Sequence, residues 1–203
     1  RGEQEARRAG ELIKKHDLFF DVAYSSVLKR AIRTQHILAE VADRVWVPEV
    51  HHWRLNERHY GALQGLNKAE TAKKYGEEQV HIWRRSFDVT PPLLEPDDSR
   101  CAVFEDKYRD VDPAVLPLGE SLALTITRVL PFWQDYIAPS LLSGKTVLVT
   151  AHGNSLRALI WMILATRRSS SWRYRRVFPN CMSWTGNCIP CLVNIWNRFP
   201  RVK

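Results

Sequence analysis

The carboxylate of Glu57 stands among cationic side chains in the stretch from Trp53 to Arg85. The cations considered with it are Arg54, Arg58, Lys68, Lys73, Arg84 and Arg85. A carboxylate can take up and release a proton while neighbouring cations hold an anionic substrate. The stretch therefore indicates acid/base chemistry on an anion. The alternative is a solvated, charged loop and helix face, which is the commoner role of a charge-rich segment.

A second candidate is His152, which lies in Ala-His-Gly-Asn, residues 151–154. The apolar run 146–151 before it is typical of a buried parallel strand, and a helix is expected over 156–165. A histidine between such a strand and a helix lies where open α/β sheets bind their ligands. A lone histidine is nevertheless more often structural than catalytic.

Arg30 is the third candidate, because it falls in the first turns of a helix expected over about 27–43. A guanidinium beside a helix N-terminus is well placed for phosphate, since the free N–H groups point the same way. Arg30 could also be an ordinary surface residue. The strand expected before it, 19–24, ends at Ser25 and Ser26, which can cap the helix.

Strands alternate with helices along the rest of the chain, which predicts an α/β fold. We expect helices at 2–15, from Lys68, around 80–87 and at 120–142 with a kink at Pro131, and a strand at 45–48. The long loop 88–117 is interpreted as an ordered excursion, although loops of this length can also be mobile lids.

These motifs together resemble the cofactor-dependent phosphoglycerate mutases of the histidine phosphatase superfamily, over roughly residues 2–165. The likeness rests on residues 29–34, 53–61, 65–72, 83–85 and 151–157. Residues 67–72 and 155–157 are more similar to the glycolytic mutase than to its sister, bisphosphoglycerate mutase. The resemblance implies a three-layer α/β sandwich around a mostly parallel central sheet.

The resemblance also implies an activity. It is the interconversion of 3-phosphoglycerate and 2-phosphoglycerate through 2,3-bisphosphoglycerate and a phosphohistidine, in the cytoplasm. Glu57 would be the acid/base and His152 would stabilise the transferring phosphoryl group. The residues expected to bind phosphate and carboxylate are Arg30, Arg58, His59, Tyr60, Lys68, Arg84, Arg85, Gly153 and Asn154. The family implies a phosphorylated small-molecule substrate, a homo-oligomer and no metal.

The family's nucleophile is a histidine in an Arg-His-Gly motif at the end of its first strand, and the sequence contains no such motif. The single Arg-His pair, Arg58-His59, is followed by Tyr60. We therefore expect that the first strand is missing and that the strand at 146–151 loses a neighbour. We also expect this chain to be inactive, because substrate positioning cannot replace a covalent step. The alternative is a non-catalytic fragment that binds anionic metabolites.

The net charge of +8 lies entirely in residues 167–203, while residues 1–166 carry 22 basic and 22 acidic side chains. A basic groove for nucleic acid is therefore not expected on the mutase-like domain, 1–166. The tail, 167–203, is predicted to be disordered or to come from a shifted reading frame, with nucleic-acid binding through it as the alternative. Its three cysteines lack a fourth ligand for zinc. The longest apolar run, 158–165, is too short to span a membrane.

Overall fold

The computed structural model describes residues 1–168 and 189–193, and for residues 68, 69, 164–168 and 189–193 it describes the backbone alone. The chain divides into two compact units, Arg1–Glu57 with Val129–Lys203, and Arg58–Arg128. Most of the predicted tail lies outside the described residues, so its disorder stays a prediction. Among the described helices, none has the length and apolar character needed to cross a bilayer.

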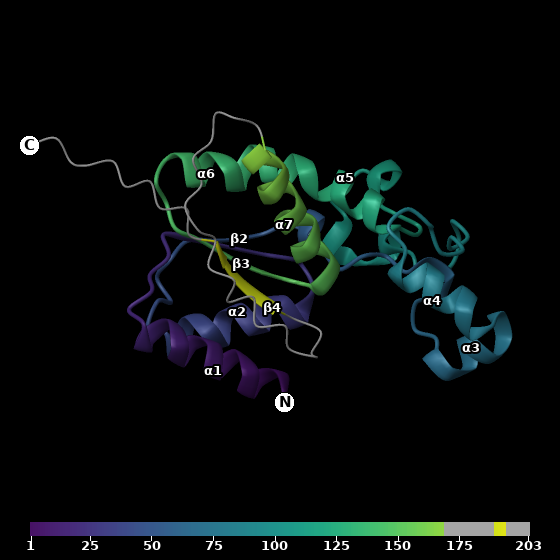
Figure 1. The fold of residues 1–203 in the computed structure, drawn as a ribbon, viewed down its shortest axis with the longest axis horizontal. Coiled ribbons are helices and arrows are strands. Elements are labelled where there is room, and N and C mark those ends of the chain that lie inside the picture. Colours follow the sequence, from purple (N-terminus) through teal and green to yellow (C-terminus); the bar gives the residue numbers. More distant parts are fainter. Residues whose placement is uncertain (169–188, 194–203) are drawn as a thin grey trace, which may run out of the picture. The chain divides into compact units, whose positions relative to one another are not determined.

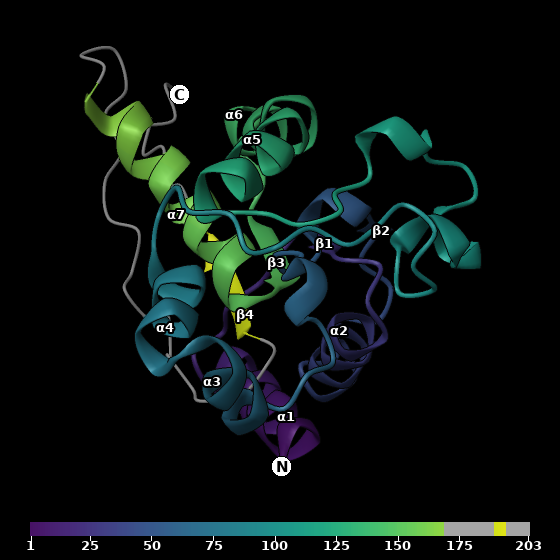
Figure 2. The same ribbon diagram turned by 90° about the vertical axis from the view of Figure 1, so that its right-hand side faces the viewer.

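The first unit is built on a four-stranded sheet with the order β2-β1-β3-β4 (Figure 2). The strands are β1 (Val22–Ser25), β2 (Glu49–His51), β3 (Val147–Ala151) and β4 (Ile189–Val193). β1 pairs in parallel with both β2 and β3, whereas β4 runs antiparallel to β3. Every residue of β1 and β3 is buried, as expected for central strands covered on both faces.

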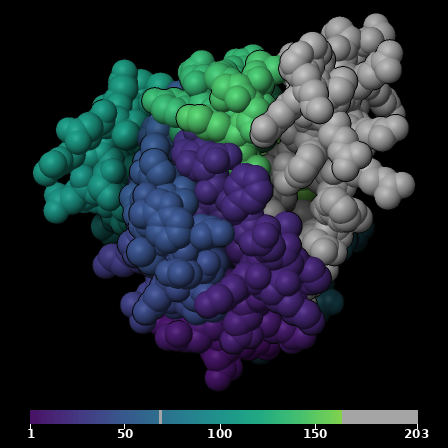
Figure 3. Space-filling model, turned by 90° about the vertical axis from the view of Figure 1, so that its left-hand side faces the viewer, coloured from purple at the N-terminus to yellow at the C-terminus, as the bar shows by residue number. Residues whose placement is uncertain are grey.

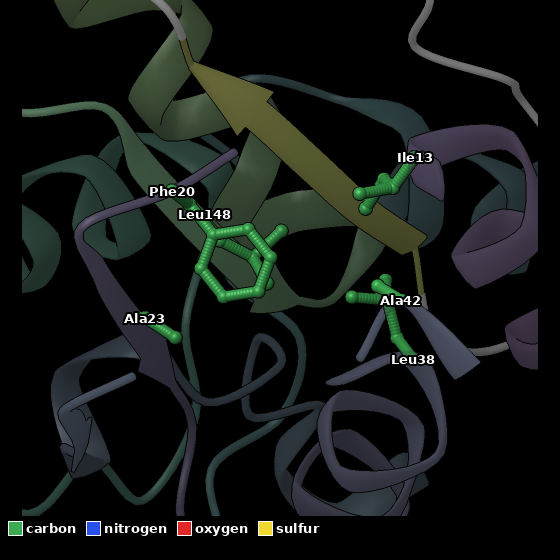
Figure 4. Packing of buried hydrophobic residues seen from close by; sticks show 6 residues of the cluster. All are labelled: Ile13, Phe20, Ala23, Leu38, Ala42 and Leu148. Atoms are coloured by element: carbon green, nitrogen blue, oxygen red, sulfur yellow. The ribbon is translucent and has the colours of Figure 1, made fainter. Parts of the chain in front are cut away.

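Helices cover both faces of this sheet, which confirms the predicted α/β sandwich. Helices α1 (Gly2–Lys15) and α2 (Lys29–Val41) lie on one face, and α6 (Ala138–Leu142) and α7 (Gly153–Arg168) lie on the other (Figure 1). The apolar cluster that joins α1 and α2 to the sheet consists of Ile13, Phe20, Ala23, Leu38, Ala42 and Leu148 (Figure 4). Burial of these side chains holds α2, the helix that carries Arg30, against the sheet.

The predicted strand at 45–48 is wrong, because β2 begins at Glu49. Asp43 has a positive φ of 57° after α2, and the amide of Val47 donates to the carbonyl of Arg44, so this segment is a turn. Val45 and Trp46 are 69% and 64% exposed, although their residue types favour strands. Pairing with β1 therefore starts only after the turn has ended.

The expected loss of pairing along the strand at 146–151 is also wrong for β3. Residues Val147 to Ala151 pair in register with Val193 to Ile189 of β4, on the side of β3 away from β1. Both sides of β3 are thus paired among the described residues. Residues Ile189–Val193 belong to the predicted tail, and here the structure describes a strand rather than disorder.

The predicted helix at 120–142 is broken into three parts. Helix α5 (Leu122–Phe132) carries Pro131 near its end, a π-helical turn follows at Trp133–Ile137, and α6 completes the run. Proline lacks the N–H that would continue the helical hydrogen bonds, so a change of helix type beside it has a direct cause. The kink at Pro131 itself stays a prediction.

The second unit contains α3 (Lys68–Tyr75) and α4 (Glu77–Arg85), followed by the long loop. The loop is ordered by three 3-10 turns at Ala102–Phe104, Asp106–Tyr108 and Pro113–Val115, which confirms the predicted excursion. Gly61 opens a further 3-10 turn with φ of +57°, and an added Cβ there would overlap the carbonyl oxygen of Pro92. A glycine is therefore required at this close approach.

Candidate active site

His152 follows directly on β3 and precedes the first residue of α7, as the sequence predicts. Its side chain is 0% exposed. The Oγ atom of Ser26 lies 2.8 Å from Nε2 of His152, and Nε of Arg30 donates to Nδ1 at 3.2 Å. The parallel pairing of Ser25 with Thr150 explains this contact, because it places the carboxyl ends of β1 and β3 together.

The two contacts of His152 define how its ring is used. A guanidinium nitrogen can only donate, so Nδ1 of His152 accepts from Arg30 and holds a lone pair. In the neutral ring, Nε2 then carries the proton and donates to Ser26 Oγ. The buried imidazole is held on both sides, and one of its neighbours is a permanent cation.

Glu57 lies at the N-terminus of α7. Its Oε1 atom accepts the backbone N–H of Asn154 at 3.2 Å, and a Cβ added to Gly153 would lie 4.0 Å from its Oε2 atom. Free N–H groups and the helix dipole favour a negative charge at this position. The structure therefore brings Ser26, Arg30, Glu57, His152 and Asn154 together within the first unit.

A second group of predicted residues lies in the second unit, around the ring of Tyr60. The guanidinium carbons of Arg58 and Arg84 lie 4.6 Å and 5.4 Å from the centre of this ring. Nη2 of Arg58 donates to the carbonyl oxygens of Trp83 and Arg84, at 3.0 Å and 3.2 Å. Arg58 is 3% exposed, so it fixes the end of α4, a role that sequence reasoning did not assign.

Arg84 carries one feature that bears on anion binding. Its Nε atom is buried and has no hydrogen-bond acceptor among the described residues. A buried donor without an acceptor is costly, so an anionic oxygen at this position would be stabilising. Arg85 is the exposed last residue of α4, and Lys68 is the first residue of α3, with a side chain outside the described part of the structure.

His59 is held by Glu120, a residue that sequence reasoning missed. Both the backbone N–H and Nδ1 of His59 contact Oε2 of Glu120, at 3.0 Å and 3.1 Å. Arg128 contacts the same carboxylate at 2.6 Å and 2.9 Å. Burial raises the pKa of Glu120, but the hydrogen bond from His59 and the charge of Arg128 outweigh it and lower the pKa to about 2. His59 is thus a positioned residue whose Nε2 atom alone is left for a ligand.

Comparison with known proteins identifies the family of the chain. Residues 1–99 match the model of the histidine phosphatase superfamily, branch 1. The 2,3-bisphosphoglycerate-dependent phosphoglycerate mutase 2 of Lactiplantibacillus plantarum is 60% identical over 159 residues, which are 78% of this chain and 69% of that protein. The corresponding mutase of Haemophilus ducreyi is 58% identical over 159 residues, which are 78% of this chain and 70% of that protein.

Solved structures of low sequence identity share the fold. A phosphoglycerate mutase from Bacillus anthracis has a TM-score of 0.55 at 22% identity, over 81% of this chain and 67% of that one. A mycobacterial glucosyl-3-phosphoglycerate phosphatase has a TM-score of 0.55 at 24% identity, over 80% of this chain and 66% of that one. With the relatives above, the chain belongs to the family of 2,3-bisphosphoglycerate-dependent phosphoglycerate mutases.

Proposed function

We propose that this protein interconverts 3-phosphoglycerate and 2-phosphoglycerate in glycolysis and gluconeogenesis, in the cytoplasm. The observation that carries the proposal is the placement of buried His152 between Ser26 and Arg30, at the helix N-terminus that also holds Glu57. Membership of the mutase family supports the same reaction.

Charge stabilisation is the role proposed for His152 and Arg30. A transferring phosphoryl group carries negative charge on its oxygens, and catalysis of the transfer consists largely of positioning and electrostatic stabilisation. The Nε atom of Arg30 donates to His152, so the two terminal nitrogens remain to bind a phosphate oxygen. The contact therefore couples the orientation of the guanidinium to that of the imidazole.

Proton transfer is the role proposed for Glu57. The hydroxyl group that accepts a phosphoryl group loses a proton, and the hydroxyl that is left behind regains one. The N–H of Asn154 holds Oε1 of Glu57, so the carboxylate is fixed at the place where α7 begins. A fixed carboxylate can serve as base in one direction and as acid in the other.

The cationic donor groups of the second unit suit a phosphorylated anion such as 2,3-bisphosphoglycerate. The buried Nε of Arg84, which lacks an acceptor among the described residues, is the observation that favours an anion. When bound, 2,3-bisphosphoglycerate supplies a phosphoryl group. The residues proposed to hold phosphate or carboxylate groups are Arg30, Arg58, His59, Tyr60, Lys68, Arg84, Arg85, Gly153 and Asn154.

The covalent step needs a nucleophilic histidine, and none of the seven histidines stands in an Arg-His-Gly triplet. A polypeptide limited to these 203 residues should therefore bind substrate without turning it over. Fusing the N-terminal segment of a related mutase before Arg1, and replacing 167–203 by that mutase's C-terminal segment, should give an active enzyme, called the fusion enzyme below.

The test has a binding arm and an activity arm. Calorimetry on the 203-residue chain should detect 3-phosphoglycerate, with binding weakened by Arg30→Ala and unchanged by Arg7→Ala, an exposed arginine on α1. Conversion of 3- to 2-phosphoglycerate with 2,3-bisphosphoglycerate present should occur in the fusion enzyme alone. An inactive, folded fusion enzyme would overturn the proposed function. Turnover by the 203-residue chain on the order of 1 per second would show that activity does not depend on the histidine of the fused segment.

A further inference from the structure

Three side chains that can bind a metal ion converge at the surface of the first unit. His36 lies on α2, and Glu49 and His51 lie on β2. Oε1 of Glu49 is 3.0 Å from Nε2 of His36 and 3.5 Å from Nε2 of His51. The ligand atoms of all three residues lie within 4.8 Å of one another. The space-filling view shows the segment around residues 35–55 at the surface (Figure 3).

The hydrogen bonds of Ser25 determine which nitrogen of His51 faces this group. The hydroxyl of Ser25 has one proton, which it donates to the carbonyl oxygen of Ser26 at 2.9 Å. Its oxygen must then accept at Nδ1 of His51, 2.7 Å away, so Nδ1 carries a hydrogen. In neutral His51 the lone pair therefore lies on Nε2, the nitrogen on the side of Glu49.

Gln35 holds the carboxylate of Glu49 in a matching orientation. Nε2 of Gln35, a residue that is 1% exposed, donates to Oε2 of Glu49 at 2.7 Å. This bond leaves Oε1 directed at both histidines. Burial raises the pKa of Glu49, but the hydrogen bonds from Gln35 and His36 outweigh it and lower the pKa, so the carboxylate is charged at neutral pH.

We propose that His36, Glu49 and His51 bind one divalent transition-metal ion, with Zn²⁺ as the expected occupant. Two imidazoles and one carboxylate are a common zinc ligand set, with water completing the coordination. Gln35 and Ser25 act as the outer partners that orient metal ligands in such sites. The side chains of His36, Glu49 and His51 are 56%, 37% and 32% exposed, so an ion can enter from solvent.

The proposed ion has a structural role that the mutase reaction does not require. It would tie α2 to β2, two elements that are otherwise joined here by Gln35 and His36 hydrogen bonds to Glu49. Arg30 stands on α2, and β2 leads within a few residues to Glu57. Because His36 and His51 lie on different elements, their convergence follows from the fold and is not visible as a short sequence motif.

The experiment measures Zn²⁺ binding by the full chain with Cys181, Cys188 and Cys191 changed to serine, since thiolates would compete for zinc. Competition with a chromophoric chelator at pH 7.5 should show one Zn²⁺ per chain. His36→Asn and Glu49→Gln should each weaken binding at least about tenfold, and Gln35→Met should weaken it by about tenfold. The matched control is His16→Asn, the same change at an exposed histidine of this unit, which should leave binding unchanged.

Two further readouts separate a metal site from a surface ion pair of the same residues. Zn²⁺ should raise the melting temperature of the parent and of His16→Asn, with EDTA reversing the shift, and should leave that of His36→Asn unmoved. Zinc binding should weaken on acidification, because protons compete with the metal ion for the same ligand atoms. The proposal is overturned if the parent binds no zinc, or if His36→Asn and Glu49→Gln, shown by circular dichroism to be folded, bind zinc as the parent does.

Discussion

The hydroxyl of Ser26 lies 2.8 Å from Nε2 of His152, although 126 positions separate the two residues in the chain. Both side chains are 0% exposed. The same oxygen accepts the backbone N–H of Leu28 at 3.2 Å, which holds it between the end of β1 and the start of α2. The orientation of the buried imidazole therefore depends on a serine that is itself fixed by backbone.

We predict that Ser26→Ala lowers the kcat of the fusion enzyme by roughly 10- to 100-fold. The change leaves Nε2 of His152 without this acceptor, which costs about 1–3 kcal/mol when the group is buried. The loss should appear in kcat more than in KM, because the ring is misplaced while the arginines that bind substrate remain. Steady-state kinetics checks this prediction. Ser143→Ala, an exposed serine whose Oγ donates to the carbonyl of Ser140, is the control.

We predict that Glu57→Gln lowers the kcat of the fusion enzyme by roughly 10²–10⁴, the usual contribution of a general acid/base. Glutamine keeps an oxygen that can accept the N–H of Asn154, so the local structure should persist. If Glu57 only shapes its loop, kcat would stay within a few-fold of the parent and stability alone would fall. Kinetics and thermal unfolding on one preparation separate the two outcomes, with Glu11→Gln on the exposed side of α1 as the control.

Elements with a strong local pattern could be predicted from the sequence. The helix expected at 2–15 is α1, and the apolar run 146–151 contains β3. Helix α7 begins at Gly153, three residues before the expected Leu156. Boundaries of this kind depend on contacts with other elements. One such contact is the hydrogen bond that the N–H of Asn154 donates to Glu57.

The residues that the sequence did not reveal are those defined by distant partners. The sequence predicts only a helix-capping role for Ser26, whereas its contact with His152 arises from the parallel pairing of β1 with β3. Glu120 was placed in a helix, and its contact with His59 joins residues 61 positions apart. No local periodicity encodes such pairs. Glu120 follows the long loop 88–117, and nothing in the neighbouring sequence indicates that it holds His59.

We predict that Glu120→Gln lowers the free energy of unfolding by about 3–5 kcal/mol, because it removes the negative partner of a buried ion pair with Arg128. Glu120 and Arg128 are 2% and 6% exposed. Urea unfolding of the 203-residue chain measures the loss. Asp98→Asn, which breaks the solvent-facing pair with Arg100 in the same unit, should cost much less. Equal losses in both variants would contradict this account.

The pH dependence of the same pair has a definite sign. The pKa of Glu120 is lowered to about 2 in the folded protein from an ordinary value of 4.5. The stability that this carboxylate contributes is therefore complete above pH 4.5 and is lost as the pH falls toward 2. Subtracting the unfolding free energies of Glu120→Gln from those of the parent at each pH should show this window. A difference that does not shrink on acidification would contradict the assignment.

His52 provides a second pH window, at higher values. Its ring stacks on Phe132 with 4.6 Å between centroids, and its Nδ1 atom accepts the backbone N–H of Arg54 at 3.2 Å. Burial, and secondarily the charge of Arg54, lower the pKa of His52 to about 4 from the ordinary 6.5. The folded state therefore favours the neutral ring.

We predict that part of the stability is lost as the pH falls from 6.5 to about 4, because unfolded His52 takes up a proton before folded His52 does. His52→Asn keeps an acceptor for the N–H of Arg54 but cannot titrate, so it should be less stable than the parent at pH 7.5 and approach it at pH 4.5. Urea unfolding at several pH values measures the difference, and His16→Asn corrects for an exposed histidine. A constant difference between parent and His52→Asn from pH 7.5 to 4.5 would show that His52 titrates normally in the folded protein.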